Sequence, residues 1–264
     1  MAQFKVSYAP PSGYPLGTNR AFKFGAGVLI PIFNIVMKRD WKGAENIPAT
    51  GRVIVASNHM SYLDVLVFTH FLFRNGRAPR YLGKSGVFKV PVIGKILLAA
   101  GQIPVERETS DAKKAVDHAK ILLEKGHMLG VYPEGTLTRE PNLWPMRGKT
   151  GAIRLALNSG VPVYPIAHWG SEKIMGRYSS KFRPGFWKKV QILVGDEIDL
   201  AKYRKENLSA QELLEATELV MRSITALVEQ LRGEKAPGTL WDPVAMGQTV
   251  TGNFEKAAKK VASQ

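Results

Sequence analysis

Short apolar runs alternate with amphipathic segments along most of this 264-residue chain. The runs RVIVA at 52–56, MLGVY at 128–132 and VQILV at 190–194 are short and rich in β-branched residues, which predicts buried strands. Helices are predicted between them, one beginning at Ser110 and another over 151–159. Strands that alternate with helices are typical of an α/β fold, in which helices flank a mostly parallel central sheet.

Local signals indicate where several elements begin and end. Ser209 and Glu212 form a capping box that begins a long amphipathic helix, and Gly233 ends it. The run VPVYPIA at 161–167 contains two prolines, which cannot donate hydrogen bonds to a sheet. This strand is therefore predicted to be an edge strand or an irregular one. A further helix is predicted over residues 21–40.

The chain is predicted to have three parts. Residues 1–44 are expected to form an N-terminal arm and a membrane-associating helix, residues 45–233 an α/β domain, and residues 234–264 a polar, basic tail. The apolar segment FGAGVLIPIFNIVM at 24–37 is too short to span a bilayer and lies between two lysines. We therefore expect an interfacial helix there. The alternative is a helix packed in the core of a soluble protein.

The balance of charge predicts an anionic partner. The chain has 37 Lys and Arg against 22 Asp and Glu, a formal net charge of +15. Nucleic acid, an anionic membrane surface and a phosphorylated substrate all fit that charge. No RNA-binding motif, zinc-ligand spacing or GXXG loop accompanies it, and the basic residues flank apolar runs, so a lipid surface is favoured over nucleic acid. The chain has no cysteine, which excludes disulfides and a cysteine nucleophile.

A histidine and an aspartate follow the first predicted strand. His59 and Asp64 stand five residues apart in the sequence HMSYLD. A carboxylate that binds one ring nitrogen of a histidine fixes its tautomer and lets the other nitrogen accept a proton. The pair therefore predicts a general base. The alternative is a surface histidine beside a helix-capping aspartate.

Two further segments carry polar residues next to predicted strands. Arg107 ends the stretch GQIPVER and is suited either to bind a phosphate or to pair with a neighbouring glutamate. In YPEGT at 132–136, Gly135 beside Glu134 permits the backbone to approach a ligand closely, or simply makes a turn. His168 follows the run at 161–167, where it either borders the site or packs in the core.

In order and spacing, these segments resemble the motifs of the glycerolipid acyltransferases typified by 1-acylglycerol-3-phosphate acyltransferase. That family has an NHxxxxD motif, a second motif running from glycine to arginine, a (F/Y)PEGT motif and a VP(I/V)xP motif. The corresponding segments here are NHMSYLD, GQIPVER, YPEGT and VPVYP, and the resemblance covers roughly residues 45–200. One departure is Leu137, which stands where the family often has an arginine; Arg139 follows two residues later.

The resemblance implies a step of phospholipid biosynthesis. A fatty acyl group passes from an acyl thioester, on coenzyme A or acyl carrier protein, to the sn-2 hydroxyl of 1-acylglycerol-3-phosphate, giving phosphatidic acid. His59 is then the general base, and Asp64 orients it and balances its charge. The residues implied to bind the acceptor and its phosphate are Arg107, Glu134, Gly135, Thr136, Arg139 and Lys149. No metal or other cofactor is expected.

Several alternatives stay open. Glycerol-3-phosphate or another lysolipid or glycolipid is a different acceptor for the same reaction. A basic nucleic-acid-binding protein and a catalytically inactive lipid-binding relative are different functions. The resemblance also implies an anionic membrane surface as a partner. The chain is accordingly expected at the cytoplasmic face of the cell membrane, as a peripheral or monotopic protein.

Overall fold

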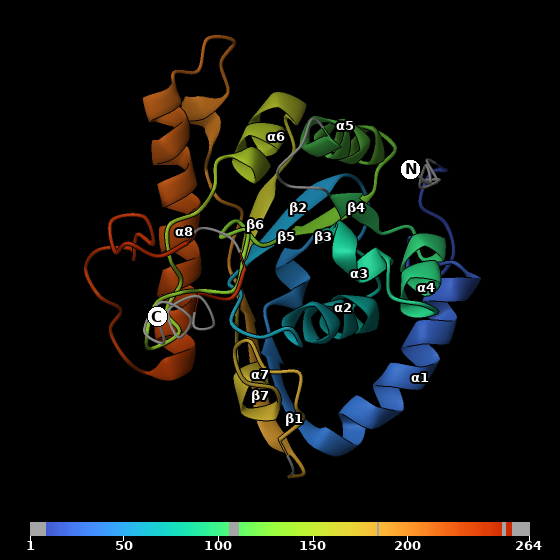
Figure 1. The fold of residues 1–264 in the computed structure, drawn as a ribbon. Coiled ribbons are helices and arrows are strands. Elements are labelled where there is room, and N and C mark those ends of the chain that lie inside the picture. Colours follow the sequence, from blue (N-terminus) through green and yellow to red (C-terminus); the bar gives the residue numbers. More distant parts are fainter. Residues whose placement is uncertain (1–8, 106–110, 184, 250–251, 255–264) are drawn as a thin grey trace.

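A seven-stranded sheet forms the centre of the molecule (Figure 1). The computed structural model describes residues 9–105, 111–183, 185–249 and 252–254. The strands are β1 (Met37–Lys42), β2 (Val53–Ser57), β3 (Arg80–Lys84), β4 (Ile103–Val105), β5 (Met128–Val131), β6 (Val163–Trp169) and β7 (Lys188–Val194). Their order is β1-β7-β6-β2-β5-β3-β4, and every neighbouring pair is parallel except β6 and β7. The predicted α/β fold with a mostly parallel sheet is confirmed.

Helices cover both faces of this sheet (Figure 1). They are α1 (Arg20–Val36), α2 (Asp64–Arg74), α3 (Ser85–Phe88), α4 (Ile93–Ala99), α5 (Asp111–Glu124), α6 (Gly151–Ser159), α7 (Ser171–Ile174) and α8 (Ala210–Arg232), with 3-10 turns at Ala44–Asn46 and Ala201–Tyr203. Apolar side chains of α5, α6 and α8 pack in one buried cluster, and those of α1 and α2 in another. Each face of the sheet therefore buries its own core.

The one antiparallel pair decides what meets at each end of the strands. Because β7 runs against β6, the strands β2, β3, β5 and β6 finish at the end of the sheet where β1 and β7 begin. We call this the carboxyl end of the sheet. The loops after β2 and β5, which hold the NHMSYLD and YPEGT motifs, meet there with the loop after β6. Ligands of open parallel sheets bind at this end.

The prediction of an edge position for residues 161–167 is wrong. β6 lies inside the sheet, between β2 and β7. Its ladder with β7 begins at Ile166, so the N–H that Pro165 lacks falls outside that ladder. The carbonyl of Pro162 accepts a hydrogen bond from the backbone N–H of Ile54 at 3.0 Å. The prolines therefore occupy positions where the absent N–H breaks no hydrogen bond between β6 and its neighbours β2 and β7.

The predicted N-terminal helix over 21–40 ends earlier than expected. The side chain of Asn19 caps α1 by accepting a hydrogen bond from the N–H of Phe22 at 2.9 Å, and the helix ends at Val36. The next six residues form β1, which pairs with β7. Only Met37 of this strand is buried, so no alternating pattern marked it in the sequence. Pairing with β7 sets its conformation, and the sheet thus includes part of the segment 1–44.

The outer surface of α1 is apolar and uncovered. Phe22 and Phe33 are buried, but Phe24, Val28 and Ile32 are exposed, as is Ile35 one turn later. Among the described residues, no helix combines the length and the apolar character needed to cross a membrane.

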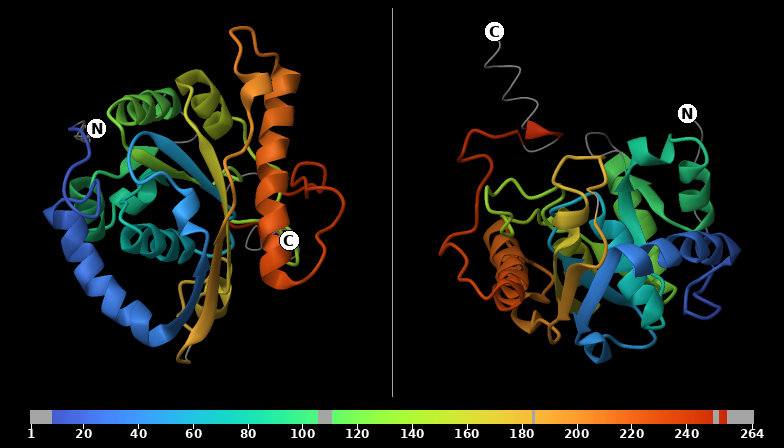
Figure 2. Two further views of the ribbon diagram at one scale, coloured as in Figure 1. Left: turned by 180° about the vertical axis from the view of Figure 1, so that it is seen from behind. Right: turned by 90° about the horizontal axis from the view of Figure 1, so that it is seen from below.

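The predicted start and end of α8 are confirmed, and the chain then turns back along it. Ser209 and Glu212 form the capping box, and Gly233 ends the helix with a positive φ of 67°. The segment after α8 runs beside it in both views of Figure 2. There the carbonyl of Trp241 accepts a hydrogen bond from the backbone N–H of Arg147 at 3.0 Å.

Candidate active site

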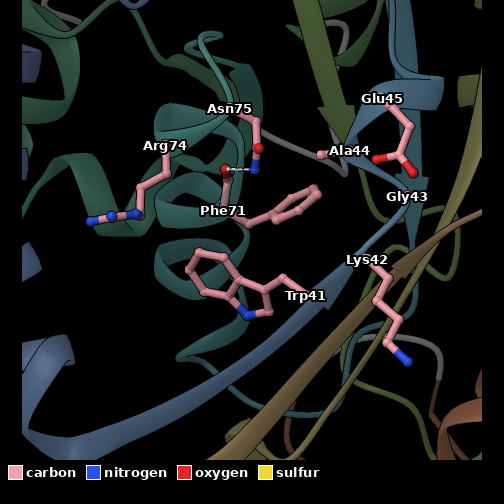
Figure 3. Close-up of a pocket in the computed structure, with 8 residues that line it drawn as sticks. All are labelled: Trp41, Lys42, Gly43, Ala44, Glu45, Phe71, Arg74 and Asn75. Atoms are coloured by element: carbon pink, nitrogen blue, oxygen red, sulfur yellow. Dashed lines mark hydrogen bonds between the residues drawn. The ribbon is translucent and has the colours of Figure 1, made fainter.

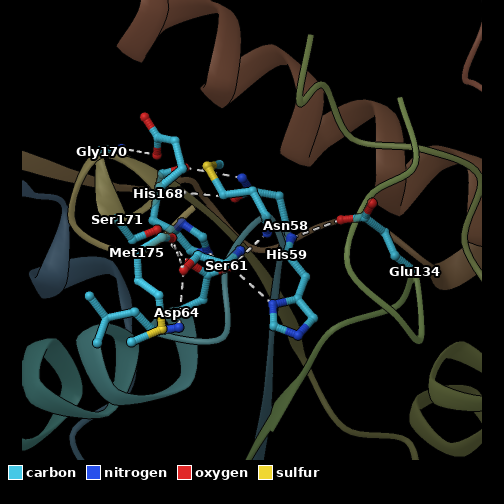
Figure 4. A network of polar contacts seen from close by, with 12 residues as sticks. Asn58, His59, Ser61, Asp64, Glu134, His168, Gly170, Ser171 and Met175 are labelled. Atoms are coloured by element: carbon cyan, nitrogen blue, oxygen red, sulfur yellow. Dashed lines mark hydrogen bonds and ion pairs between the residues drawn. The ribbon is translucent and has the colours of Figure 1, made fainter. Parts of the chain in front are cut away.

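The loop after β2 brings His59 and Asp64 together, as the sequence predicts (Figure 4). Nδ1 of His59 lies 2.9 Å from Oδ2 of Asp64, the first residue of α2. The Asp64 side chain is fully buried, whereas 15% of the His59 side chain is exposed. Because the carboxylate engages Nδ1, the neutral ring presents the lone pair of Nε2. That nitrogen is available to take a proton from a substrate.

Asp64 is ionised and firmly held. Three more donors reach its carboxylate: the backbone N–H groups of Met60 (2.6 Å) and Ser61 (2.8 Å) and the hydroxyl of Ser171. Burial alone would raise the pKa of Asp64, but the nearby His168 and His59 and these hydrogen bonds outweigh it, so its pKa lies below the usual value. A buried negative charge beside His59 stabilises the imidazolium that forms when Nε2 accepts a proton.

The ring of His59 rests on an aromatic neighbour. It stacks on Tyr132, the residue after β5, with the ring centroids 4.2 Å apart and the planes at 23°. Burial raises the pKa of Tyr132, so its hydroxyl stays protonated. Asp64 on one side and Tyr132 beneath fix the orientation of the ring.

His168 borders this pair. This is one of the two alternatives predicted from its position after a strand, the other being a place in the core. It is fully buried on β6, and its Nε2 lies 3.6 Å from Oδ2 of Asp64. Burial lowers the pKa of His168, although the Asp64 carboxylate acts in the opposite direction. The Asn58 side chain donates to the carbonyl of His168 and accepts from its N–H, both at 3.0 Å. The end of β2 is thereby joined to the end of β6 beside the His59–Asp64 pair.

Ser171, which no sequence motif marked, also belongs to the site. It opens α7 two residues after β6 and donates its hydroxyl proton to Oδ1 of Asp64. Nearby, the Ser61 hydroxyl donates to the carbonyl of Met175 at 2.5 Å. The only local signal for Ser171 was its place just beyond a strand that ends at the carboxyl end of the sheet.

Glu134 supports the backbone of the catalytic loop. Its Oε1 accepts a hydrogen bond from the N–H of His59 at 2.8 Å, and its Oε2 accepts one from the N–H of Met146 at 3.2 Å. Only 1% of the side chain is exposed. Burial raises the pKa of Glu134 to about 8, although both N–H donors act in the opposite direction. In the structure Glu134 positions the backbone around His59, and the predicted contact with the acceptor stays a prediction.

Replacing Glu134 with glutamine is expected to lower turnover and stability together. The amide keeps one acceptor but turns a donor toward one of the two backbone N–H groups, and the lost hydrogen bond costs about 1–3 kcal/mol. Unfolding in urea and initial rates of acyl transfer measure the two effects. Glutamate-to-glutamine replacement at exposed Glu215 is the matched control, with changes within about 0.5 kcal/mol expected.

The same variant has a defined pH dependence. The pKa of Glu134 lies near 8 in the folded protein against an ordinary value of 4.5. Its contribution to stability is therefore complete below about pH 4.5 and is lost as the pH rises through 8. Glutamine does not ionise, so the stability gap between wild type and E134Q should shrink between pH 5 and pH 9. A gap that widens over this range would contradict the assignment.

Three of the predicted acceptor-binding residues lie beside this loop. Gly135 has a φ of 70°, and a Cβ there would lie 2.9 Å from Cδ of Lys149. The backbone N–H of Lys149 donates to the carbonyl of Pro133 at 2.8 Å, and its side chain is exposed. Thr136 is half-buried next to them. The structure thus brings a lysine, rather than an arginine, alongside the PEGT segment.

Arg139, one of the two predicted arginines, does not join this surface. Arg139 is fully buried, donates to the carbonyl of Gly252 at 3.3 Å and packs its guanidinium over the ring of Phe254. Leu137, at the position where the family often has arginine, is buried as well. Arg139 therefore does not supply a charge beside Gly135. Arg107 lies outside the described residues.

A separate depression lies at the opposite end of the sheet (Figure 3). It has a volume of about 330 Å³ and is lined by Trp41, Lys42, Gly43, Ala44, Glu45, Phe71, Arg74 and Asn75. Because β1 ends there, where β2 and β6 begin, it is remote from His59. In the described part of the chain, no three His, Asp or Glu side chains are grouped so as to hold a metal ion.

Comparison with known proteins relates the chain to a family. The profile of the family described as Acyltransferase matches residues 38–169, half of the chain, and this range includes His59, Asp64 and Glu134. The chain belongs to the acyltransferase family. The predicted resemblance is confirmed at the level of the family.

Individual relatives of this acyltransferase-family chain agree. It is 37% identical over 142 residues to a chloroplast 1-acyl-sn-glycerol-3-phosphate acyltransferase of Brassica napus, a match that spans 52% of this chain and 39% of the relative. The chain thus spans about two fifths of that relative's length. It is 28% identical over 214 residues to the 1-acyl-sn-glycerol-3-phosphate acyltransferase of Bacillus subtilis, covering 80% of this chain and 98% of the relative.

A solved structure has the same fold. The 1-acyl-sn-glycerophosphate acyltransferase PlsC from Thermotoga maritima superposes with a TM-score of 0.60 over 81% of this chain and 79% of that one. The two sequences are 24% identical, so this likeness concerns the fold alone.

Proposed function

We propose that this chain transfers a fatty acyl group from an acyl thioester to the sn-2 hydroxyl of 1-acylglycerol-3-phosphate, and so makes phosphatidic acid. The observation that carries the proposal is the His59–Asp64 pair, with a partly exposed ring on an ionised, buried carboxylate. The names of the Brassica and Bacillus relatives support the acceptor. The donor is an acyl group on coenzyme A or on acyl carrier protein.

The transfer is a direct attack with His59 as general base. Nε2 of His59 takes the proton of the acceptor hydroxyl as its oxygen bonds to the thioester carbonyl carbon. Asp64 stabilises the imidazolium. The C–S bond then breaks, the sulfur takes the proton back from Nε2, and the products are the ester and a free thiol. Atoms and charge balance without a covalent enzyme intermediate or a cofactor.

Lys149 is the described cation best placed for the acceptor's phosphate, because its exposed side chain lies against Gly135 next to the catalytic loop. Replacing Lys149 with alanine is expected to raise KM for a phosphorylated acceptor by about 10–150-fold, since a hydrogen bond to a charged group contributes about 1.5–3 kcal/mol. KM for the acyl donor should change less than twofold. Lys120→Ala on α5 is the matched control. An equal rise in KM for a neutral lysolipid would exclude a phosphate contact.

We further propose that the protein works as a peripheral or monotopic protein on an anionic membrane surface, at the cytoplasmic face. The uncovered apolar surface of α1 and the net charge of +15 support this placement. A lipid acceptor that stays in the bilayer would then meet His59 at the membrane surface.

The decisive experiment is acyl transfer by the purified protein. Palmitoyl- and oleoyl-coenzyme A and acyl carrier protein thioesters are the donors, and lysophosphatidic acid, glycerol-3-phosphate and a neutral lysolipid are the acceptors. Preference for lysophosphatidic acid, lost in His59→Ala, supports the proposal. Preference for glycerol-3-phosphate or the neutral lysolipid replaces the acceptor but keeps the reaction. No transfer with any pair, from folded protein with added lipid, overturns it.

A further inference from the structure

Three apolar segments lie uncovered around the carboxyl end of the sheet, the end that holds His59. The exposed side chains are Ile32 and Ile35 on α1, Val87, Val90, Val92 and Ile93 in and between α3 and α4, and Phe182, Phe186 and Trp187 in the loop between α7 and β7. α1 leads into β1, α3 follows β3, and the loop leads into β7. Because β1 and β7 begin where β3 and β6 finish, all three segments belong to one end of the molecule.

The loop between α7 and β7, described at 175–183 and 185–187, holds its tip away from the core; we call it the aromatic loop. Phe186 is 77% and Trp187 73% exposed. Trp187 has a positive φ of 52°, a strained conformation for a bulky residue. Its N–H donates to the carbonyl of Ile35, at 3.4 Å, so the tip lies against the end of α1. Two large aromatic side chains are thus exposed to solvent, at a strained backbone position that the hydrogen bond to α1 holds in place. Such exposed apolar groups suggest a surface that binds a partner or a membrane.

The charges around the aromatic loop select the kind of partner. Between Glu172 and Asp196 the chain has no acidic residue and six basic ones: Lys173, Arg177, Lys181, Arg183, Lys188 and Lys189. The side chain of Lys188 donates hydrogen bonds to the carbonyls of Lys173 (2.8 Å) and Arg183 (3.0 Å) and so connects the two sides of the loop. Lys189 is paired with Asp40 of β1 at 2.9 Å, which leaves five basic residues in this stretch without that carboxylate. Exposed tryptophan and phenylalanine in a stretch rich in lysine and arginine match the interface of an anionic bilayer.

We infer that the aromatic loop inserts Phe186 and Trp187 into the surface of an anionic bilayer, beside the apolar side of α1. The base of the same loop holds the catalytic network. The carbonyl of Met175 accepts a hydrogen bond from the Ser61 hydroxyl. The ring of Tyr178 packs edge-on against that of Tyr62, a residue that lies between His59 and Asp64 in the sequence. Insertion of the tip therefore places the mouth of the site against the headgroups. The inference rests on the proposed function in one respect, that the acceptor is a lipid.

The test compares the full chain with the double variant Phe186→Ser, Trp187→Ser. Vesicles of equal parts phosphatidylglycerol and phosphatidylcholine, and vesicles of phosphatidylcholine alone, are sedimented with each protein. We expect the variant to partition into the anionic vesicles at least about tenfold less than wild type, because two aromatic side chains no longer enter the interface. The double variant Val244→Ser, Met246→Ser, at two residues similarly exposed beyond α8, should stay within about twofold of wild type.

Acyl transfer separates the inference from the proposed function. The loop variant should keep wild-type rates on a monomeric, short-chain lysophosphatidic acid and lose at least about tenfold on the same headgroup embedded in vesicles. Loop-dependent vesicle binding by a wild-type protein that transfers no acyl group would refute the function and support the inference. Unchanged vesicle binding by a folded loop variant overturns the inference. The inference is also overturned if the loop variant loses acyl transfer only when acyl carrier protein is the donor. That result would make the loop a docking surface for the carrier protein.

Discussion

Replacing His59 with alanine is expected to lower kcat by about 10²–10⁴-fold, the usual contribution of a positioned general base. The physical reason is that Nδ1 contacts Asp64 at 2.9 Å, so Nε2 is the nitrogen left for the proposed transfer of the hydroxyl proton. The ring is partly exposed, and its removal leaves the core intact. KM for both substrates should change little, because the base acts on a proton in transit.

The matched control for this prediction is another histidine to alanine. His118 on α5 is half-buried and far along the chain from the site, and His118→Ala should keep nearly full activity. Initial rates at saturating donor and acceptor, with unfolding curves for both variants, measure the effect. If His59→Ala keeps more than about a tenth of wild-type kcat, His59 is not the base.

Replacing Asp64 with asparagine is expected to cost about as much activity, for a different reason. The amide oxygen can take the place of Oδ2 and keep the bonds from His59 and from the backbone N–H groups of Met60 and Ser61. The amide nitrogen then faces the Ser171 hydroxyl, which turns to accept. The geometry is retained but the negative charge is lost, so the imidazolium is no longer stabilised.

The two substitutions should not add. Since Asp64 acts through His59, the double variant is expected to be within a few-fold of His59→Ala alone. Ser171→Ala provides the control for a structural effect, because it removes a bond to Oδ1 and leaves the charge. Multiplicative losses in the double variant would show that Asp64 supports the fold and not the base.

The local part of the site was predictable from sequence because its partners are close along the chain. A five-residue span lets a loop histidine fold back onto the first residue of a helix, and the structure has this contact between His59 and Asp64. The capping box that starts α8 is equally local and was found in the same way. In both cases the backbone between the partners is short enough for residue type and spacing to decide the contact.

The parts that were missed depend on segments that meet only in three dimensions. Because of its prolines, β6 was predicted to be an edge strand or an irregular one, but the register places Pro165 outside the ladder with β7. Glu134 was assigned to the acceptor, whereas its oxygens bind the N–H groups of His59 and Met146. Arg139 was predicted to bind the acceptor, and it is fully buried with its guanidinium over the ring of Phe254. No spacing rule reports such contacts.

The supports of the catalytic pair lie far away along the chain, and this has a consequence for when the site comes into being. Glu134 stands 75 residues beyond His59, Ser171 stands 107 residues beyond Asp64, and His168 stands 110 residues beyond Asn58. A nascent chain that has left the ribosome only as far as β5 has the histidine and the aspartate without what holds them. The arrangement around His59 and Asp64 is therefore completed late in synthesis, when β6 docks beside β2.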